Sequence, residues 1–408
     1  MKKQNSYNLR VKGNIRDLLA FKNLLAQRKK IIEQAPNSSL EMDTMKFLSE
    51  RLHPLKQFLV IKEVTQISKT AKMFKFTPDI YSETKTLAFF RAGQYLSFKV
   101  NINGISITRP YSIASSPFDA QKGFYEVAIR REEHGFFTNY IWDNWKVGTK
   151  VETSGPEGFF YYNPLRDSTN ILGIAGGSGI TPFRSIAKSI LEGIDPIKLT
   201  LLYGSADQDD IIFYEELKQI ENEIPNKFKM IPVLNCEEVT LEGCEQGFIT
   251  AEIMKKYGDI ENSSLFICGP QVMYQFIDKE ITKLNIPLKR IRKEVYGEVK
   301  TISNYPNFPS KLINETFNIE VRMGNLIKII PGKTTESVLV ALERAGLNPP
   351  SLCRSGECGY CRSTLISGKV YVNPQTDKRR LADINFNNFH PCSSYPITDL
   401  IIEVPRSI

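Results

Sequence analysis

The segment ILGIAGGSGITPFRSIAKSI occupies residues 171–190 and contains an apolar run, a glycine-rich turn and an amphipathic stretch in direct succession. The pattern predicts a strand that ends at Ala175 and a helix that begins near Thr181-Pro182. Glycines at such a junction let the phosphates of a dinucleotide approach the helix N-terminus. The candidate contacts are Gly176, Gly177, Ser178, Gly179, Thr181 and Pro182. Their spacing is not the G-x-G-x-x-G of classical dehydrogenases, so the turn alone is weak support.

The sequence around this segment repeats the alternation of strand and helix. Apolar runs such as LTLLYGS, KMIPVLN and SLFICG are separated by amphipathic stretches, which predicts a doubly wound parallel α/β sheet over residues 166–300. Cys268-Gly269-Pro270 ends a later strand, so we expect this turn and the 176–182 turn to open at the same edge of the sheet. Cys268 could instead be an ordinary buried cysteine.

Residues 55–165 have a different texture, with short β-rich runs separated by turns, which predicts an antiparallel β-barrel. At the end of one strand lies Arg109-Pro110-Tyr111-Ser112, whose side chains suit a flavin: an aromatic ring to stack on it, a hydroxyl for its edge and a guanidinium for its phosphates. Gly135-Phe136-Phe137-Thr138 opens a short helix that could hold a pyrophosphate. Alone, this motif would more simply be a glycine turn with a threonine cap.

A third region follows residues 301–315, which lack periodicity and are expected to be a linker. Residues 316–408 have the size of a small α+β domain and contain Cys353-x4-Cys358-x2-Cys361, with Cys392 after 30 intervening residues. This spacing is that of a plant-type [2Fe-2S] site. A structural zinc site is the alternative, but zinc ribbons normally use two C-x2-C knuckles. His390 is expected to be a loop residue, because a Rieske centre needs two histidines.

The net charge of +8 is concentrated at one end, because residues 1–53 hold eleven Lys/Arg and five Asp/Glu. We expect residues 1–54 to form a helical, basic extension that packs on the chain's own barrel, although recruitment of a partner or an anionic surface stays open. No nucleic-acid motif accompanies the charge. No apolar run spans a bilayer and no signal peptide is evident, so we expect a cytoplasmic protein; peripheral contact with a membrane stays open.

Taken in order, these motifs, together with Ala92-Gly93-Gln94-Tyr95, Gly155-Pro156-Glu157-Gly158 and Glu294-Val295-Tyr296-Gly297, resemble the ferredoxin-NADP reductase superfamily fused to a C-terminal plant-type ferredoxin. Reductases of bacterial oxygenases and of the phenylacetate pathway have this form. The resemblance implies a multidomain fold: an FAD-binding antiparallel β-barrel, a nicotinamide-binding α/β domain and a β-grasp ferredoxin domain. It also implies catalytic roles for Ser112, Thr181, Cys268, Glu294 and Tyr296, and cofactor contacts from Arg109, Pro110, Tyr111, Ser112, Ile129, Gly135, Phe137, Thr138, the 176–182 turn, Ser205, Asp207, Cys268, Gly269, Pro270 and Tyr296.

The implied function is an electron-transport oxidoreductase that passes electrons from NADH through FAD and [2Fe-2S] to a protein acceptor. Ala206 stands where an arginine would meet the 2′-phosphate of NADPH, and Asp207 could bond the ribose hydroxyl, which favours NADH. We expect Arg354, Glu357 and Arg362 to line the approach of the acceptor. Two alternatives stay open: direct reduction of a small molecule such as a quinone or free flavin, and a non-enzymatic redox-sensing module.

Overall fold

The computed structural model describes residues 15–35, 43–236, 241–299, 301–374 and 376–406, in two compact units, Met1–Leu48 and Ser49–Ile408. Helix α1 (Ile15–Glu33) lies in the first unit and exposes most of its apolar side chains, whereas the boundary between the two units falls within α2 (Thr44–Leu52). The expected packing of these helices on the barrel stays a prediction. Residues 1–14 and 36–42 of the expected extension lie outside the described residues. No helix within the described ranges is both long and apolar enough to cross a membrane.

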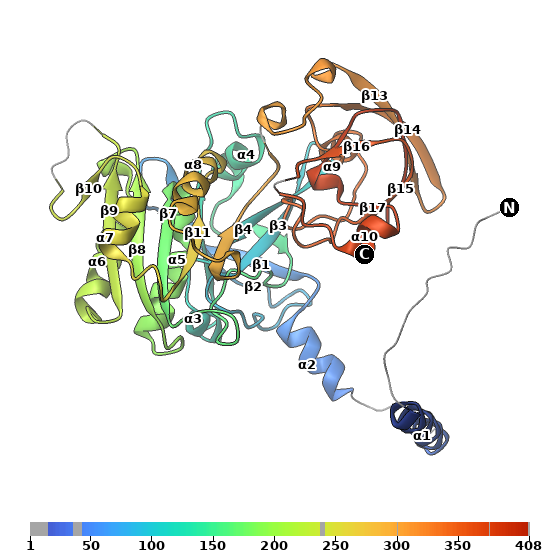
Figure 1. Cartoon of the computed structure of the whole chain (residues 1–408), viewed down its shortest axis with the longest axis horizontal. Helices are drawn as coiled ribbons and strands as arrows, with labels where there is room; N and C mark the ends of the chain where they lie inside the picture. Colours follow the sequence, from blue (N-terminus) through green and yellow to red (C-terminus); the bar gives the residue numbers. More distant parts are fainter. Residues whose placement is uncertain (1–14, 36–42, 237–240, 300, 375, 407–408) are drawn as a thin grey trace. The chain divides into compact units, whose positions relative to one another are not determined.

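The second unit begins with the predicted antiparallel sheet (Figure 1). Its strand order is β4-β3-β6-β1-β2-β5, and Ala114 N–H donates to Glu126 O over 2.7 Å where β4 and β5 meet to close the barrel. Phe74, Phe76 and Phe98 surround Trp145 in the core. The elements are β1 (Gln57–Gln66), β2 (Ala71–Pro78), β3 (Tyr95–Ile102), β4 (Ile105–Ser112), α3 (Pro117–Gln121), β5 (Tyr125–Arg130), α4 (Phe136–Asn144) and β6 (Lys150–Thr153).

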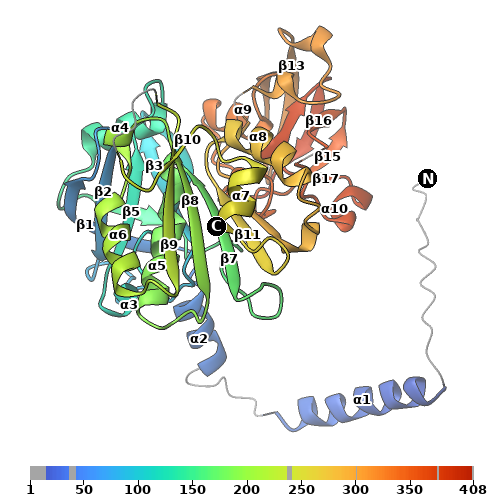
Figure 2. The same ribbon diagram turned by 60° about the vertical axis from the view of Figure 1, so that its left-hand side comes forward.

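The predicted doubly wound sheet follows, with all neighbouring strands parallel in the order β10-β9-β8-β7-β11-β12 (Figure 2). Phe183 of α5 and Leu217 of α6 belong to one core cluster, whereas Met254 of α7 and Ile277 of α8 belong to another, so helices cover both faces. The elements are β7 (Asn170–Gly176), α5 (Thr181–Leu191), β8 (Lys198–Ser205), α6 (Tyr214–Glu223), β9 (Phe228–Leu234), β10 (Glu245–Gln246), α7 (Ala251–Tyr257), β11 (Ser263–Cys268), α8 (Gln271–Thr282) and β12 (Ile291–Glu294).

The C-terminal part is a mixed sheet of order β14-β13-β19-β15-β17, against which α9 packs through Val338, Ala341 and Leu342. Strands β13 and β19 are parallel, and their neighbours are antiparallel. A second small sheet pairs β16 with β18. The elements are β13 (Thr316–Met323), β14 (Leu326–Lys333), α9 (Val338–Arg344), β15 (Ser363–Ser367), β16 (Val370–Val372), α10 (Leu381–Asn385), β17 (Asn388–Phe389), β18 (Ser394–Pro396) and β19 (Leu400–Glu403).

The segment expected to be a linker, residues 301–315, packs on this C-terminal part. Ile302 and Phe308 are buried and share a cluster with Tyr371 and Tyr395, and the Tyr371 hydroxyl donates to Pro306 O over 2.7 Å. Apolar side chains were spaced too irregularly in this segment to predict its contacts. The connection is therefore ordered by the domain that follows it.

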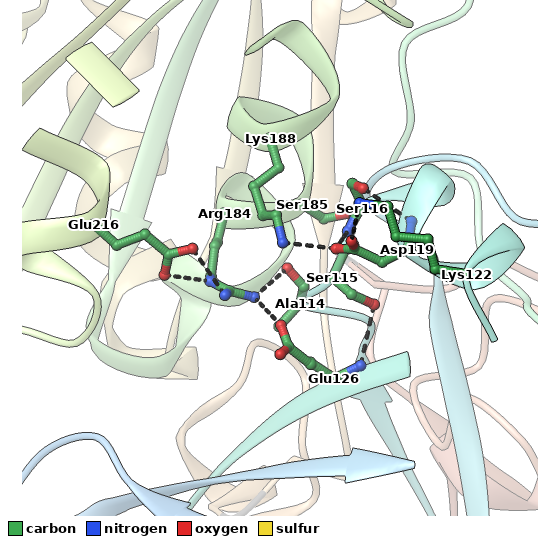
Figure 3. Close-up of polar contacts among 10 residues, drawn as sticks. All are labelled: Ala114, Ser115, Ser116, Asp119, Lys122, Glu126, Arg184, Ser185, Lys188 and Glu216. Atoms are coloured by element: carbon green, nitrogen blue, oxygen red, sulfur yellow. Dashed lines mark hydrogen bonds and ion pairs between the residues drawn. The ribbon is translucent and has the colours of Figure 1, made fainter. Parts of the chain in front are cut away.

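A polar network joins the barrel to the parallel sheet (Figure 3). Arg184 of α5 is buried, and its guanidinium bonds Glu126 of β5 at 2.8 Å, Glu216 of α6 at 2.7 Å and the carbonyl of Ala114 at 2.8 Å. Lys188, one turn further along α5, bonds Asp119 of α3 at 2.6 Å. Because each buried charge has a partner from the other domain, the network fixes how α5 lies on the barrel.

We predict that Lys188→Met lowers the free energy of unfolding by about 3 kcal/mol at neutral pH, because the buried Asp119 carboxylate loses its closer cationic partner and keeps the exposed Lys122 at 3.4 Å. Although burial alone raises it, the hydrogen bond and charge of Lys188 hold the pKa of Asp119 below its usual range. This stabilisation is present above the unfolded pKa of about 4 and is lost as the pH falls through the lower folded pKa, so the deficit should persist from pH about 7 to about 5 and narrow below about 4. Denaturant unfolding at several pH values measures it.

Lys122→Met is the matched control, since Lys122 also faces Asp119, at 3.4 Å, but its side chain is 51% exposed. We expect its effect to stay below about 1 kcal/mol. A Lys188→Met deficit that did not change with pH would contradict the assignment.

Candidate functional site

The loops after β7 and β11 meet at the carboxyl edge of the parallel sheet, as the sequence predicts. A Cβ atom on Gly179 would lie 2.1 Å from the carbonyl oxygen of Cys268 and 2.7 Å from Cα of Gly269, so only glycine allows this backbone contact. Gly176 is equally close to α8, because its Cβ would lie 2.6 Å from the sulfur of Met273. The glycines thus bring two turns and two helix N-termini into one place, which suits the phosphates of a dinucleotide.

The rest of the 176–182 turn is held by its own neighbours. Gly177 has a positive φ of 51°, and its carbonyl accepts from the Tyr203 hydroxyl over 3.1 Å. The Thr181 hydroxyl donates to Ser178 O over 2.8 Å, and Pro182 lies in the first turn of α5. Arg130 of β5 lies beside Gly177 and pairs with Asp210 at 2.6 Å. Sequence reasoning missed Arg130, since only the fold brings β5 to this loop.

The residues predicted to hold a flavin lie along β4 and α4. Tyr111 stacks on Phe137 with ring centroids 6.3 Å apart. Arg109 lies over the same ring at 5.7 Å, and its guanidinium donates a hydrogen bond to Thr108 O over 3.0 Å. Because most of its N–H groups remain available, Arg109 fits a phosphate of FAD. Pro110 is buried next to it.

The turn before α4 explains why residue 135 is glycine. A Cβ on Gly135 would lie 2.4 Å from the Thr138 hydroxyl oxygen, and this oxygen accepts from Glu132 N–H over 3.2 Å. Thr138 therefore closes the turn, which was the alternative to pyrophosphate binding. Ile129 is fully buried in the barrel core, so only its main chain is left for a cofactor.

Ser112, Glu294, Tyr296 and Cys268 come together from three elements. Ser112 and Tyr296 share a hydrogen bond of 2.8 Å between their hydroxyl oxygens. Cys268 and Glu294 are direct partners in the pairing of β11 with β12, and both are buried. Burial raises the pKa of Glu294 well above its usual range, with the charge of Glu357 acting in the same direction, and burial also raises the pKa of the Cys268 thiol. Both groups are thus favoured in their protonated forms, which can donate hydrogen bonds.

Tyr95 extends this group of side chains and was noticed in the sequence only as part of a motif. Its ring contacts Tyr296 edge to face, with centroids 5.8 Å apart. Gly158, with a φ of 100°, lies so close that a Cβ would be 2.9 Å from the Tyr95 ring. Tyr95 is buried, so Tyr296 has an aromatic neighbour on the barrel side.

Asp207 and Ser205 follow β8. The Asp207 carboxylate accepts from Asp209 N–H over 2.9 Å and so caps a short 3-10 helix, while the Ser205 hydroxyl donates to Asp207 O over 2.9 Å. Lys69, from the β1–β2 turn, lies 3.9 Å from Asp207 and 3.2 Å from Asp209. The aspartate is therefore ordered by its own loop, while its side chain remains 55% exposed.

The four cysteines predicted as metal ligands are free thiols: Cys353, Cys358 and Cys361 lie in one loop, and Cys392 lies in a 3-10 helix after β17. Cys361 and Cys392 lie with sulfurs 3.4 Å apart. Backbone N–H groups of Ser355 and Cys358 donate to the Cys353 sulfur over 3.5 and 3.4 Å, and Tyr360 N–H donates to the Cys358 sulfur over 3.4 Å. Such N–H donors around thiolates suit an iron–sulfur cluster. No group of three or more ligand side chains within the described residues has the arrangement for a single metal ion.

Gly356 in this loop has a φ of 81°, and a Cβ there would lie 2.5 Å from the Ser393 hydroxyl oxygen. His390 supports the same loop, because its Nδ1 lies 2.7 Å from Gly356 O. This agrees with the prediction that His390 is a loop residue. One expectation is wrong: Arg354 does not line an open approach, since it is buried between Glu343 and Glu298. Arg362 is exposed but pairs with Asp383 at 2.8 Å.

Comparison with known proteins agrees with this geometry. The oxidoreductase FAD-binding domain matches residues 58–162, the oxidoreductase NAD-binding domain 174–279 and the 2Fe-2S iron-sulfur cluster binding domain 327–396. NADH-cytochrome b5 reductase 1 of Meyerozyma guilliermondii is 34% identical over 202 residues, which are 48% of this chain and 69% of that protein. The chain belongs to the ferredoxin-NADP reductase superfamily.

Two further comparisons concern the whole architecture of this superfamily member. The ferredoxin reductase component of 3-ketosteroid-9-alpha-monooxygenase from Rhodococcus rhodochrous is 27% identical over 343 residues, 82% of this chain and 93% of that protein. The solved structure of phthalate dioxygenase reductase has a TM-score of 0.59 at 22% identity, covering 86% of this chain and 98% of that one, and so shares the fold. The predicted fold class and the FAD, nicotinamide and [2Fe-2S] cofactors are confirmed. This reductase is an NAD(P)H oxidoreductase of electron transport.

We predict that Cys358→Ser abolishes the rhombic electron paramagnetic resonance signal of the reduced cluster and lowers the bound iron and sulfide, because it removes one of four ligands. Flavin content should be unchanged. Cys244→Ser is the control, because Cys244 follows β9 and lies outside the loop. Equal iron in the two variants would show that Cys358 is not a ligand.

Proposed function

We propose that the chain takes electrons from NADH and delivers them singly to a protein acceptor, a terminal oxygenase or another metalloenzyme, which docks at the exposed tip of the cysteine loop. The supporting observation is that the hydroxyl pair Ser112–Tyr296 and the cysteine loop are neighbours within one compact unit. Strand β4, which carries Ser112, contacts α9 of the ferredoxin domain, and Tyr95 of the neighbouring strand β3 contacts Tyr296. These contacts support electron transfer between the two sites.

FAD, when bound, accepts the two electrons of a hydride and gives them up singly, and a [2Fe-2S] cluster carries one. The chain's own residues bind and orient. In this proposal Arg109 holds phosphate, Tyr111 and Tyr296 flank the ring, and the Ser112 hydroxyl donates to its edge. Protonated Glu294 and the Cys268 thiol keep the nicotinamide pocket uncharged. Tyr296 and the 176–182 turn exclude water from the place where nicotinamide meets flavin.

The exit for electrons is suggested by exposure around the cysteine loop. Cys353, Cys361 and Cys392 are buried, whereas Cys358 is partly exposed and its neighbours Glu357 and Tyr360 are exposed. A partner at Glu357–Tyr360 would approach the ligand nearest the surface. Similarity to the ferredoxin reductase component of 3-ketosteroid-9-alpha-monooxygenase supports an oxygenase as the partner, since that protein serves a monooxygenase and the match spans most of both chains.

The preference for NADH is supported by the loop after β8. Asp207 places a carboxylate where a 2′-phosphate would be repelled, and Ala206 offers it no cation. Lys69 is the nearby positive charge, but Asp207 and Asp209 already face it.

We predict that Asp207→Asn raises kcat/KM for NADPH about tenfold relative to NADH, a change of about 1.4 kcal/mol in discrimination. Asparagine can still cap the 3-10 helix, so the loop should keep its shape. Asp209→Asn removes a charge that lies closer to Lys69, at 3.2 rather than 3.9 Å, but two residues further along the loop, and we expect a smaller change. Equal changes in both variants would point to the general charge of the loop rather than to Asp207.

Anaerobic titration with NADH tests the whole proposal, with NADPH in parallel. We expect flavin bleaching followed by the cluster signal in the parent protein. Cys358→Ser should still reduce ferricyanide at the parent rate but lose reduction of an acceptor protein. If Cys358→Ser reduced a quinone or free flavin at the parent rate, and no protein acceptor were reduced by the parent, the direct reductase would be supported instead. If the parent did not turn over NADH, the redox sensor would be supported.

A further inference from the structure

Arg354, the residue after the first cysteine ligand, is held in a position that the proposed electron path does not explain. Its side chain is completely buried and its backbone adopts a φ of 59°, which is unusual for a residue other than glycine. Its Nη2 lies 2.8 Å from one oxygen of Glu343, and its Nη1 bonds the other. Nη2 also bonds Glu298. The positive φ of Arg354 costs conformational energy, and the ion pairs with both carboxylates hold the buried guanidinium in this position.

The two carboxylates come from different domains. Glu343 lies in α9, within the ferredoxin domain, and is 7% exposed at its side chain. Glu298 lies two residues after Tyr296, in the segment that ends the parallel-sheet domain. The Glu343 contact therefore shapes the cysteine loop, while the Glu298 contact joins this loop to the segment that carries Tyr296.

The segment that carries Glu298 is itself fixed on both sides. Glu298 O accepts from the Gln271 amide over 2.8 Å, at the start of α8. The next residue, Val299, accepts from the Tyr395 hydroxyl over 3.5 Å, on the ferredoxin side. A displacement of Glu298 would thus disturb contacts with both α8 and the ferredoxin domain.

The barrel also comes close to this ion pair, because β4, which carries Arg109, contacts α9, which carries Glu343. The pairing of Arg354 with Glu343 and Glu298 therefore lies near all three cofactor-binding domains.

We propose that Arg354 is a positioning residue whose bond to Glu298 docks the cysteine loop against the Tyr296 segment and so sets the rate of electron transfer from flavin to cluster. This inference rests on the proposed function. Each transfer moves one electron, which oxidises the reduced flavin by one and reduces the cluster by one, and NADH supplies both electrons. The bond contributes alignment and takes no part in hydride transfer.

Glu298→Gln tests this proposal, because it removes the charge from outside the ferredoxin domain and leaves Glu343 to support the loop. We expect unchanged iron content and a rate of flavin bleaching by NADH within about twofold of the parent, while the rate of cluster reduction falls about tenfold or more from misplacement. Stopped-flow absorbance separates the two rates. Glu298→Asp, which keeps the charge, should restore part of the lost rate.

A second readout does not depend on turnover. With the ferredoxin domain undocked, small-angle X-ray scattering of the oxidised protein should show a larger radius of gyration. Glu320→Gln is the matched control, because Glu320 pairs with Arg322 on the partly exposed face of the same domain. We expect it to match the parent in every measurement.

Three outcomes are decisive. A parent protein whose cluster is not reduced by NADH would overturn the proposed function. A parent that is reduced, with Glu298→Gln equal to it in cluster reduction and in radius of gyration, would overturn only the role of Arg354. Equal slowing of flavin and cluster reduction in Glu298→Gln would also overturn that role, since the carboxylate would then act on Tyr296.

Discussion

The close approach of the loops after β7 and β11 is the constraint on which the nicotinamide side of the molecule depends. Gly179 lies against the main chain of Cys268, and no side chain fits between them. Because β11 also pairs with β12, the same contact determines the positions of Glu294, at the end of β12, and of Tyr296, two residues later. If β12 were paired with β11 in a different register, Tyr296 would move away from Ser112. The register of the parallel sheet therefore determines whether the hydrogen bond between Tyr296 and the barrel can form.

Buried arginines are used twice to join domains, with different chemistry around them. Arg184 connects α5 to the barrel through Glu126 and a main-chain carbonyl. Arg354 connects the cysteine loop to Glu298 and Glu343. A buried ion pair adds little net stability compared with apolar packing, but it penalises every arrangement in which one partner is left alone. Such contacts are suited to fixing orientation rather than to increasing stability.

Much of the fold could be predicted from the sequence, because strand and helix periodicities and the glycine turns are local signals. The four cysteines and Arg109–Ser112 could be found in the same way, since their spacing reflects the chemistry they serve. The places of Arg354, Arg130 and Tyr95 could not, because each depends on a contact between segments far apart in the chain. Arg354 shows the difference most clearly: its position beside a ligand suggested a surface role, whereas Glu298, 56 residues earlier, makes it a buried one.

The packing of residues 301–315 has a consequence for the exchange of modules between reductases. Ile302 and Phe308 complete the apolar cluster around Tyr371 and Tyr395, so this stretch belongs physically to the ferredoxin domain although it precedes the first strand. A chimera joined at Thr316 would leave those tyrosines facing water and would replace a fitted tether with a foreign one. The natural splice point lies before Ile302. A domain transferred from that point would bring its own tether, which sets the effective concentration of the cluster at the flavin.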